Sequence, residues 1–489
     1  MNLLKIKNIK TLIGIALISA VTLTGCNKYL DVNDNPNNPD KADPSLLLPT
    51  VQASISQVVG NSFQIYGGMW SQYWTQNPTS SQYRSIDQYQ VLNTATSRAW
   101  LILYRNALNN AELIINSNVP NSEYYKGIAY IMKAYSFQVA TDAFGDVPLS
   151  EALKGADFLN PTYESQELVY DSIFNYIDKG LALLNTSNAN ATPVTTQDML
   201  FNGDLEKWEQ FGNTLALRAY LRLSEVDEAK ASAGVKALYA RKAAFLAENA
   251  TITYTATGGN ENPLNNEMIG LGRTQNIVAS STAVSAFVQN NDPRRFAFYD
   301  AVAAQDTIAH ILQGSYSSNT KKLVASPSYN VGGNASDQKS ALAPAKLFST
   351  SESYFLQAEA VVRGWAAGDA NNLYTQGIQA SFDELGIDQE ESADYLAQAT
   401  VKFPTTTTDE KIEAIITQKY YAMCGFQGFE AWTEWRRTGY PTFLIVSKAS
   451  RLGNDNMPLR LPYPDSEITS NGNFPGNVTI EKPVWWDVN

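Results

Sequence analysis

The sequence is poor in the residues that build metal sites, disulfides and histidine-based catalytic centres. Its 489 residues include two cysteines, Cys26 and Cys424, and one histidine, His310. Zinc sites of the usual His and Cys type are therefore excluded, as are metalloproteases that use a pair of histidines. A Ser-His-Asp triad would have to use His310, which lies in a polar stretch, and the chain has no nucleophile-elbow motif. We expect neither a metal nor a cofactor.

Basic residues are also scarce, and long apolar runs are absent beyond the N-terminus. The formal net charge is −12, with 36 Lys and Arg against 48 Asp and Glu. Such an acidic balance argues against nucleic acid and against an anionic membrane surface as partners. Because no run after the first 25 residues is long and apolar enough, we expect no membrane-spanning helix in the rest of the chain.

The N-terminus has the pattern of a bacterial lipoprotein signal. Lys5, Lys7 and Lys10 precede an apolar run over residues 11–23, and Leu23-Thr24-Gly25-Cys26 closes it. The run is too short to span a bilayer as a mature helix and is followed by a cleavage site. We therefore expect residues 1–25 to be removed, which takes the net charge from −12 to −15, and Cys26 to carry a lipid anchor.

Residues 26–44 form a proline- and asparagine-rich leader, which predicts a flexible attachment rather than a regular element. Asp31, Asn33 and Asn35 match the first ligands of an EF-hand, but Pro36 occupies its glycine position and Ala42 its glutamate position, so we reject that site. With Cys26 lipidated, Cys424 has no partner for an internal disulfide. It lies in an apolar helical run and is expected to be a buried hydrophobic residue.

Periodic apolar residues predict an all-α-dominated fold of helix pairs. In the first pair, Trp100, Tyr104 and Leu108 recur at helical spacing after Ser97. Pairs of large- and small-patterned helices in series resemble tetratricopeptide units, although the strict 34-residue period is absent. A loop-rich insertion at about 251–345 interrupts them, with a short strand expected in 251–257. The expected pairs span about 97–143, 165–223, 351–385 and 409–437.

Several motifs occur in an order that resembles the SusD/RagB family, in its SusD-like branch. Each motif alone is weak, but together they cover nearly the whole mature chain. The motifs are D-V-N-D-N-P-N-N-P at 31–39, P-S-L-L-L-P at 44–49, D-A-F-G-D-V-P at 142–148, N-D-P-R at 291–294, W-T-E-W-R-R-T-G at 432–439 and L-R-L-P-Y-P at 459–464.

This resemblance implies one domain over 45–489, with tetratricopeptide-like helix pairs wrapped by a loop-rich ligand-binding region with few short strands. It also implies an outer-membrane lipoprotein facing the cell exterior, which captures a nutrient for a SusC-like TonB-dependent transporter and is not an enzyme. An oligosaccharide is the first expectation and an oligopeptide the runner-up. A glycoside hydrolase and a scaffold without ligand remain alternatives. Asp383 and Glu384, being adjacent on a helix, do not face one another as a hydrolytic pair would.

A sugar-binding site needs flat aromatic rings beside amides, carboxylates or guanidinium groups. The stretch 63–89 is rich in both, although Trp70 and Trp74 at i, i+4 would equally suit a helix core, so Tyr83 and Tyr89 are the better surface candidates. Further candidates come from the insertion. Asp142–Asp146 and Trp432–Arg437 are expected to be structural, with a buried ion pair to Glu430 or Glu434. The expected ligand-binding residues are Trp70, Tyr73, Trp74, Asn77, Tyr83, Arg84, Tyr89, Tyr254, Arg273 and Tyr316.

Overall fold

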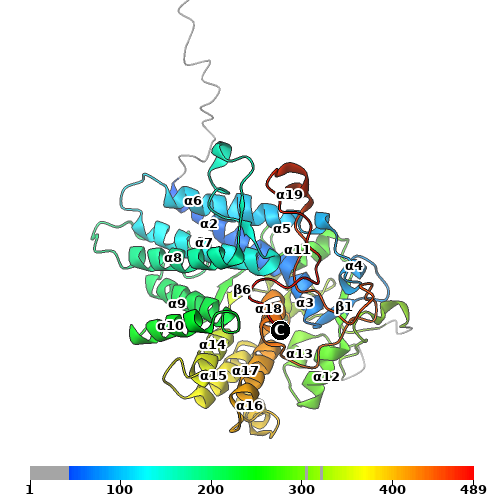
Figure 1. The fold of residues 1–489 in the computed structure, drawn as a ribbon. Helices are drawn as coiled ribbons and strands as arrows, with labels where there is room; N and C mark the ends of the chain where they lie inside the picture. Colours follow the sequence, from blue (N-terminus) through cyan, green and yellow to red (C-terminus); the bar gives the residue numbers. More distant parts are fainter. Residues whose placement is uncertain (1–42, 303–306, 320–322) are drawn as a thin grey trace, which may run out of the picture. The chain divides into compact units, whose positions relative to one another are not determined.

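The structure, a computed structural model, describes residues 43–302, 307–319 and 323–489 (Figure 1). Cys26, the leader and the rejected EF-hand residues lie outside the described residues. Helices dominate the body, as expected, and the strands are few and short. None of the described helices combines the length and the apolarity needed to cross a membrane.

The first helices of the body pack against the helices that follow them. Helix α2 (Pro44–Gln57) begins where the Asp43 carboxylate accepts a hydrogen bond from the Ser45 amide at 2.8 Å, with a proline in the first turn. It packs against α6 (Asn109–Ile115) and α7 (Glu123–Phe144), and a π-helical turn (Val58–Ser62) leads into α3 (Phe63–Trp70). Every residue of α3 is buried, so this helix is enclosed on all sides.

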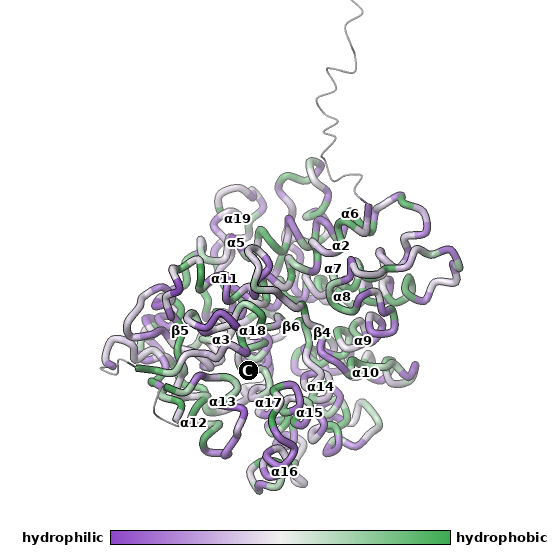
Figure 2. The backbone as a smooth tube through the Cα atoms, turned by 180° about the vertical axis from the view of Figure 1, so that it is seen from behind, coloured by the Kyte–Doolittle hydropathy of each residue, from purple (hydrophilic) through white to green (hydrophobic). Residues whose placement is uncertain are grey.

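The predicted helix pairs are present and pack in sequence order (Figure 1). Helix α7 lies along α8 (Gln166–Leu184), α8 along α9 (Leu205–Arg222), and α9 along α10 (Glu228–Ala240). A Cβ added to Gly180 would lie 2.8 Å from the Gly127 carbonyl oxygen, so glycine is required where α7 and α8 cross. Figure 2 shows apolar and polar residues mixed along these outer helices, as expected when each helix buries one face.

The later pairs continue the series. Helix α14 (Thr350–Val362) packs against α15 (Ala370–Glu384) and α17 (Thr408–Met423), and α18 (Gly428–Thr438) packs mainly against α3. The sequence did not lead us to expect α10 or α16 (Gln389–Ala397). Tyr395 of α16 is buried against Phe382 of α15, with ring centres 5.2 Å apart, so α16 covers the end of the third pair.

The insertion contains more regular structure than expected. It holds α11 (Pro263–Gly270), α12 (Ser281–Gln289) and α13 (Arg295–Phe298). The expected strand in 251–257 is shorter, β4 (Ala250–Ile252), and pairs antiparallel with β6 (Ala345–Phe348). Antiparallel pairing of β1 (Trp74–Gln76) with β5 (Ile277–Ala279) fixes the insertion to the segment after α3. A third pair joins β2 (Val147–Pro148) to β3 (Tyr163–Glu164).

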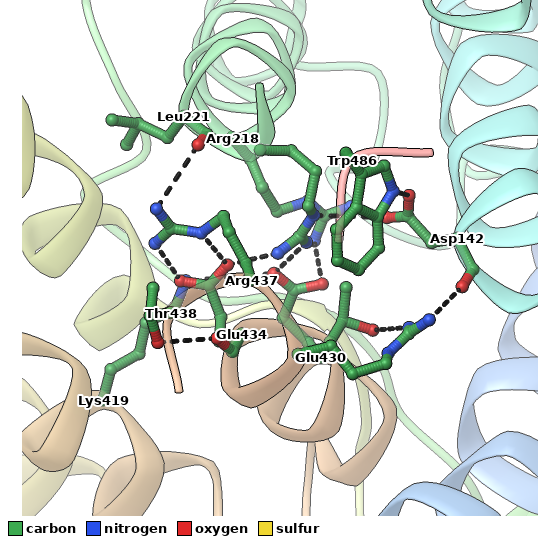
Figure 3. A network of polar contacts seen from close by, with 12 residues as sticks. Asp142, Arg218, Leu221, Lys419, Glu430, Glu434, Arg437, Thr438 and Trp486 are labelled. Atoms are coloured by element: carbon green, nitrogen blue, oxygen red, sulfur yellow. Dashed lines mark hydrogen bonds and ion pairs between the residues drawn. The ribbon is translucent and has the colours of Figure 1, made fainter. Parts of the chain in front are cut away.

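A buried ionic network connects the helix pairs (Figure 3). Arg437 Nη2 lies 2.7 Å from Glu434 Oε2, and the Arg437 guanidinium makes two further contacts of 2.7 Å with Glu359 of α14. Arg222 of α9 contacts Glu434 and lies 2.5 Å from Glu430. These contacts confirm the expected ion pair of the Trp432–Arg437 motif and extend it to α9 and α14.

The network has two more anchors. Lys419 of α17 places its Nζ 3.2 Å from Glu434 Oε2. Asp142, at the end of α7, lies 3.4 Å from Arg222 and accepts hydrogen bonds from Tyr170 and from Trp486 near the C-terminus. The D-A-F-G-D motif is therefore structural, as predicted.

Candidate functional site

A surface pocket of about 240 Å³ opens where the aromatic stretch meets the insertion. Its residues come from the π turn and α3, from α4 (Arg84–Asp87) and the turn before it, from residues 95–98, and from α11. The chain segments meet here because β1 and β5 pair directly after α3 and α11. The lining residues are Asn61, Ser62, Ile65, Tyr66, Gln82, Tyr83, Ser85, Ile86, Ala95, Arg98 and Glu267.

Two tyrosine rings form the inner wall of the pocket. Tyr66 and Tyr83 are each 7% exposed, so a small part of each residue remains accessible. Trp70 packs behind this wall, with its ring centre 5.8 Å from that of Tyr66. Its indole nitrogen donates a hydrogen bond to the Ile86 carbonyl at 3.2 Å. Trp70 in turn packs on Trp432 of α18, with ring centres 4.8 Å apart. This packing holds the rings in place before any ligand arrives.

The rim of the pocket is polar and carries one pair of opposite charges. Arg98 Nη1 lies 3.8 Å from Glu267 Oε2, and the two side chains are 64% and 24% exposed. The Tyr83 hydroxyl donates to Glu267 Oε1 at 3.4 Å. Burial, together with the Glu267 charge, raises the pKa of Tyr83, so its hydroxyl stays protonated as a donor. Gln82 and Ser85 add an exposed amide and an exposed hydroxyl.

This arrangement suits a ligand with an apolar face and many hydroxyl or amide groups. The accessible parts of the two tyrosines offer apolar contact, while Arg98 donates, Glu267 accepts, and Gln82 and Ser85 do both. Glu267 is the single carboxylate in the lining, whereas glycoside hydrolysis needs two facing carboxyl groups. Within the described residues no cluster of three or more His, Cys, Asp or Glu side chains could hold a metal ion.

Three of the expected ligand-binding residues lie in the core instead. Trp70, Tyr73 and Trp74 are at most 1% exposed, so the expectation of an exposed platform is wrong for them. The Tyr73 ring packs on Tyr420, with centres 4.6 Å apart, and the Trp74 ring lies against Gly68. Trp70 and Trp74 do not form one helical stripe, because Trp70 ends α3 and Trp74 begins β1. Both are buried because α18 packs on α3 and β5 pairs with β1.

Tyr83 and Tyr89 were expected at the surface, and both are buried. Tyr83 nevertheless lines the pocket. Tyr89 is 3% exposed, and its hydroxyl accepts a hydrogen bond from the Ser447 amide at 2.9 Å, which ties the C-terminal loops to this segment. The chain turns at Tyr89, which has a positive φ of 57°.

The remaining candidates lie outside the pocket lining, and their role in ligand binding stays a prediction. Arg84 is exposed and lies over the ring of Tyr316, which is buried, at 5.3 Å. Asn77 shapes a turn, because its side-chain oxygen accepts from the Thr79 amide at 3.0 Å. Tyr254 shares a hydrogen bond of 2.6 Å with Ser56. Arg273 is exposed at a positive φ of 58°.

The four polar residues of the rim, Gln82, Ser85, Arg98 and Glu267, were not among the expected ligand-binding residues, and neither was Tyr66. Arg98 follows the helix start at Ser97 and shows no local signal of a binding role. Glu267 is 184 positions from Tyr83, so only the folded chain brings the two together. The high density of aromatic and amide residues in 63–89 was the one usable signal.

Comparisons with known proteins agree with this fold. A search of curated protein sequences finds no match. Among solved structures, a chitin-binding SusD homologue from Flavobacterium johnsoniae is 25% identical with a TM-score of 0.75, over 91% of this chain and 98% of that chain. Another structure, described as a chitin-binding protein, is 25% identical with a TM-score of 0.76, over 91% and 100%. A SusD homologue from Bacteroides uniformis is 24% identical with a TM-score of 0.76, over 91% and 99%.

The family comparison covers most of the chain. Residues 36–464 match the SusD-like family model described as "Starch-binding associating with outer membrane". The match includes the helix pairs, the insertion and every residue of the pocket. The chain therefore belongs to the SusD-like family of nutrient-binding proteins associated with the outer membrane.

Proposed function

We propose that the pocket bounded by Tyr66, Tyr83, Arg98 and Glu267 binds an oligosaccharide for uptake. The observation that carries this proposal is the pairing of two fixed tyrosine rings with a polar rim in one pocket. A sugar ring presents an apolar C–H face to aromatic side chains and hydroxyl groups to the rim. The match to two structures described as chitin-binding makes chitooligosaccharides the first ligands to try.

We infer that the chain binds its ligand without cleaving it. The pocket supplies one carboxylate, and that carboxylate is already engaged by Tyr83 and Arg98. A hydrolase would need a second carboxyl group across the bound sugar, at roughly 5–10 Å. The runner-up ligand, an oligopeptide, would place its own charges against Arg98 and Glu267.

We also infer a lipid anchor at Cys26 and a place in the outer membrane facing the exterior. Support comes from the lipoprotein signal around Gly25-Cys26 and from the family's association with the outer membrane. In this role the protein passes its ligand to a SusC-like TonB-dependent transporter. Cells grown with radiolabelled palmitate should label the wild-type chain and leave Cys26→Ala unlabelled, and label in both chains would refute the anchor. Co-purification of a transporter with the wild-type chain would support the partner.

The ligand experiment uses the mature chain with Cys26→Ser to avoid lipidation. Isothermal titration against chitooligosaccharides, maltooligosaccharides and a mixed tripeptide panel identifies the ligand class, and chromatography of the same mixtures detects cleavage. Arg98→Ala and Glu267→Gln should each weaken binding about 10- to 150-fold, because a charge-assisted hydrogen bond contributes roughly 1.5–3 kcal/mol. Arg451→Ala and Glu391→Gln, at exposed positions outside the pocket, are the matched controls.

Three results would contradict the proposal. Binding to peptides and not to glycans would show that the ligand is an oligopeptide. Release of shorter sugars would show that the protein is a hydrolase. Unchanged glycan affinity in both pocket variants would move the site elsewhere on the body.

A further inference from the structure

A small cavity inside the body is lined by α7, α9, β6 and the first turn of α18, and shares no residue with the surface pocket. Its volume is about 20 Å³, and all twelve residues that line it are at most 9% exposed. A space of this size holds one water-sized molecule, since roughly 10–15 Å³ is enough for one water. Six of the lining residues carry an amide or a charge: Gln138, Asp142, Arg218, Lys346, Gln427 and Glu430.

The side-chain amide of Gln138, on α7, has a fixed orientation. Its oxygen accepts hydrogen bonds from Arg218 Nε at 2.9 Å and from Arg218 Nη2 at 2.7 Å. Because an arginine side chain only donates, turning the amide over would set its nitrogen against two donors. Gln138 Nε2 is therefore the end left over, and it is buried with no hydrogen-bond partner in the described part of the chain.

Gln427, directly before α18, is oriented by a carboxylate instead. Its Nε2 donates to Glu352 Oε2 at 2.6 Å, so turning this amide over would set a carbonyl against a carboxylate. Glu352 Oε1 lies 3.4 Å from Arg218 Nη1, and a chain of contacts thus runs from Gln138 through Arg218 and Glu352 to Gln427. Gln427 Oε1 is buried and has no partner among the described residues. The two amides leave one donor and one acceptor unpaired at the same cavity.

We propose that the cavity is a binding site for one internal water molecule, which accepts a hydrogen bond from Gln138 Nε2 and donates one to Gln427 Oε1. Leaving both buried groups unpaired costs more free energy than immobilising one water. Two more contacts are available to it, because Arg218 Nη1 and Glu430 Oε2 lie 4.0 Å apart, a separation that a water can bridge. The water then has two donors and two acceptors around it.

The chemistry of the lining selects water over an ion. A cation cannot bind the N–H donor of Gln138, and an anion cannot bind the carbonyl oxygen of Gln427, whereas water does both. The lining also carries two acidic and two basic side chains, so its formal charges cancel. A neutral molecule that both donates and accepts fits these groups best.

The proposed water connects three helices of the body. Gln138 belongs to α7, Arg218 to α9 and Glu430 to α18. These helices are also joined by the ionic network around Glu434, and the water adds polar contacts that the side chains do not make directly. This role is independent of what the surface pocket binds.

The test is a crystal structure of the Cys26→Ser mature chain, with Val59→Ile and Val235→Ile made in the same background. Val59 lines the cavity, so its added methyl group takes up space that the water needs, whereas Val235 of α10 is also buried but lies outside the lining. Burial raises the pKa of Glu352 although Arg218 and Lys419 oppose the rise, so the crystals are grown at about pH 8 to keep this carboxylate ionised. Oxygen-17 relaxation dispersion counts the slowly exchanging internal waters of the same chains in solution.

We expect a density peak in the parent cavity within hydrogen-bond distance of Gln138 Nε2 and Gln427 Oε1. Val59→Ile should lose this peak and one slowly exchanging water, while Val235→Ile should keep both. A parent cavity without a peak, at a resolution that shows ordered waters elsewhere in the body, would overturn the inference. A peak that contacts only donors or only acceptors would indicate an ion and overturn it as well. If Val59→Ile does not fold, the parent structure decides.

Discussion

The ionic network around Glu434 gives a prediction whose size follows from the structure. Glu434 contacts Arg222, Lys419 and Arg437, and all four side chains are at most 4% exposed. Burial alone would raise the pKa of Glu434, but the three positive charges outweigh it and hold the pKa well below its usual value. Glu434→Gln keeps the size of the side chain and removes the charge that these cations share.

We expect Glu434→Gln to lower the free energy of unfolding by about 3–5 kcal/mol. Removing one member of a buried ion pair leaves its partner charge uncompensated, and losses of that size are usual. For a body of more than 400 residues the unfolding entropy is on the order of 1 kcal/mol per degree, so the melting temperature should fall by roughly 3–5 °C. Urea unfolding followed by tryptophan fluorescence and differential scanning calorimetry measure the two quantities.

The same substitution predicts a change in pH dependence. Because the Glu434 pKa is lowered on folding, its stabilisation is present above the ordinary carboxyl pKa and is lost as the pH falls through the folded value. The difference between wild type and Glu434→Gln should therefore shrink in acid. Glu391→Gln, at an exposed position on α16, is the control and should change stability by less than about 0.5 kcal/mol. A loss below about 1 kcal/mol for Glu434→Gln would refute the view that this network joins the helix pairs.

Three further predictions concern packing and reactivity. Gly67→Ala should lower the free energy of unfolding by about 1–3 kcal/mol or more, because the added Cβ would lie 2.2 Å from the Phe429 backbone nitrogen. The control Gly270→Ala adds a Cβ in open space and should leave thermal unfolding unchanged. Trp74→Ala should cost about 3–5 kcal/mol in urea unfolding, since the ring is fully buried; unchanged stability would return Trp74 to the list of ligand-contacting residues. Cys424, buried and with its thiol pKa raised by burial, should react with a maleimide only after denaturation, and labelling of the native chain would contradict its core position.

The sequence predicted the helix pairs because their signals are local. Apolar residues at helical spacing, such as Trp100, Tyr104 and Leu108, marked the first pair, which ends with α7. Helix α10 escaped notice because it is rich in alanine and buries only a narrow face, made by Ala231, Gly234, Val235 and Leu238. The insertion was harder, since its short helices and its pairing with β1 depend on partners far away in the chain.

The site was predicted less well than the fold. The density of aromatic residues in 63–89 located the right segment, but burial of each ring depends on neighbours that the segment does not reveal. Trp70 is covered by Trp432, which is 362 positions later, and Glu267 reaches Tyr83 only through α11. Tyr66 lines the pocket while Trp70, four positions later, is buried behind it. The difference depends on which distant residues pack on each ring, and the local sequence does not show this.

The most direct test of the ligand site is a crystal structure of the Cys26→Ser mature chain with the oligosaccharide that the titrations select. The structure predicts a sugar ring against Tyr66 and Tyr83, with its hydroxyl groups hydrogen-bonded to Arg98 and Glu267. Ligand density at any other place on the body, with this pocket holding only solvent, would contradict the account.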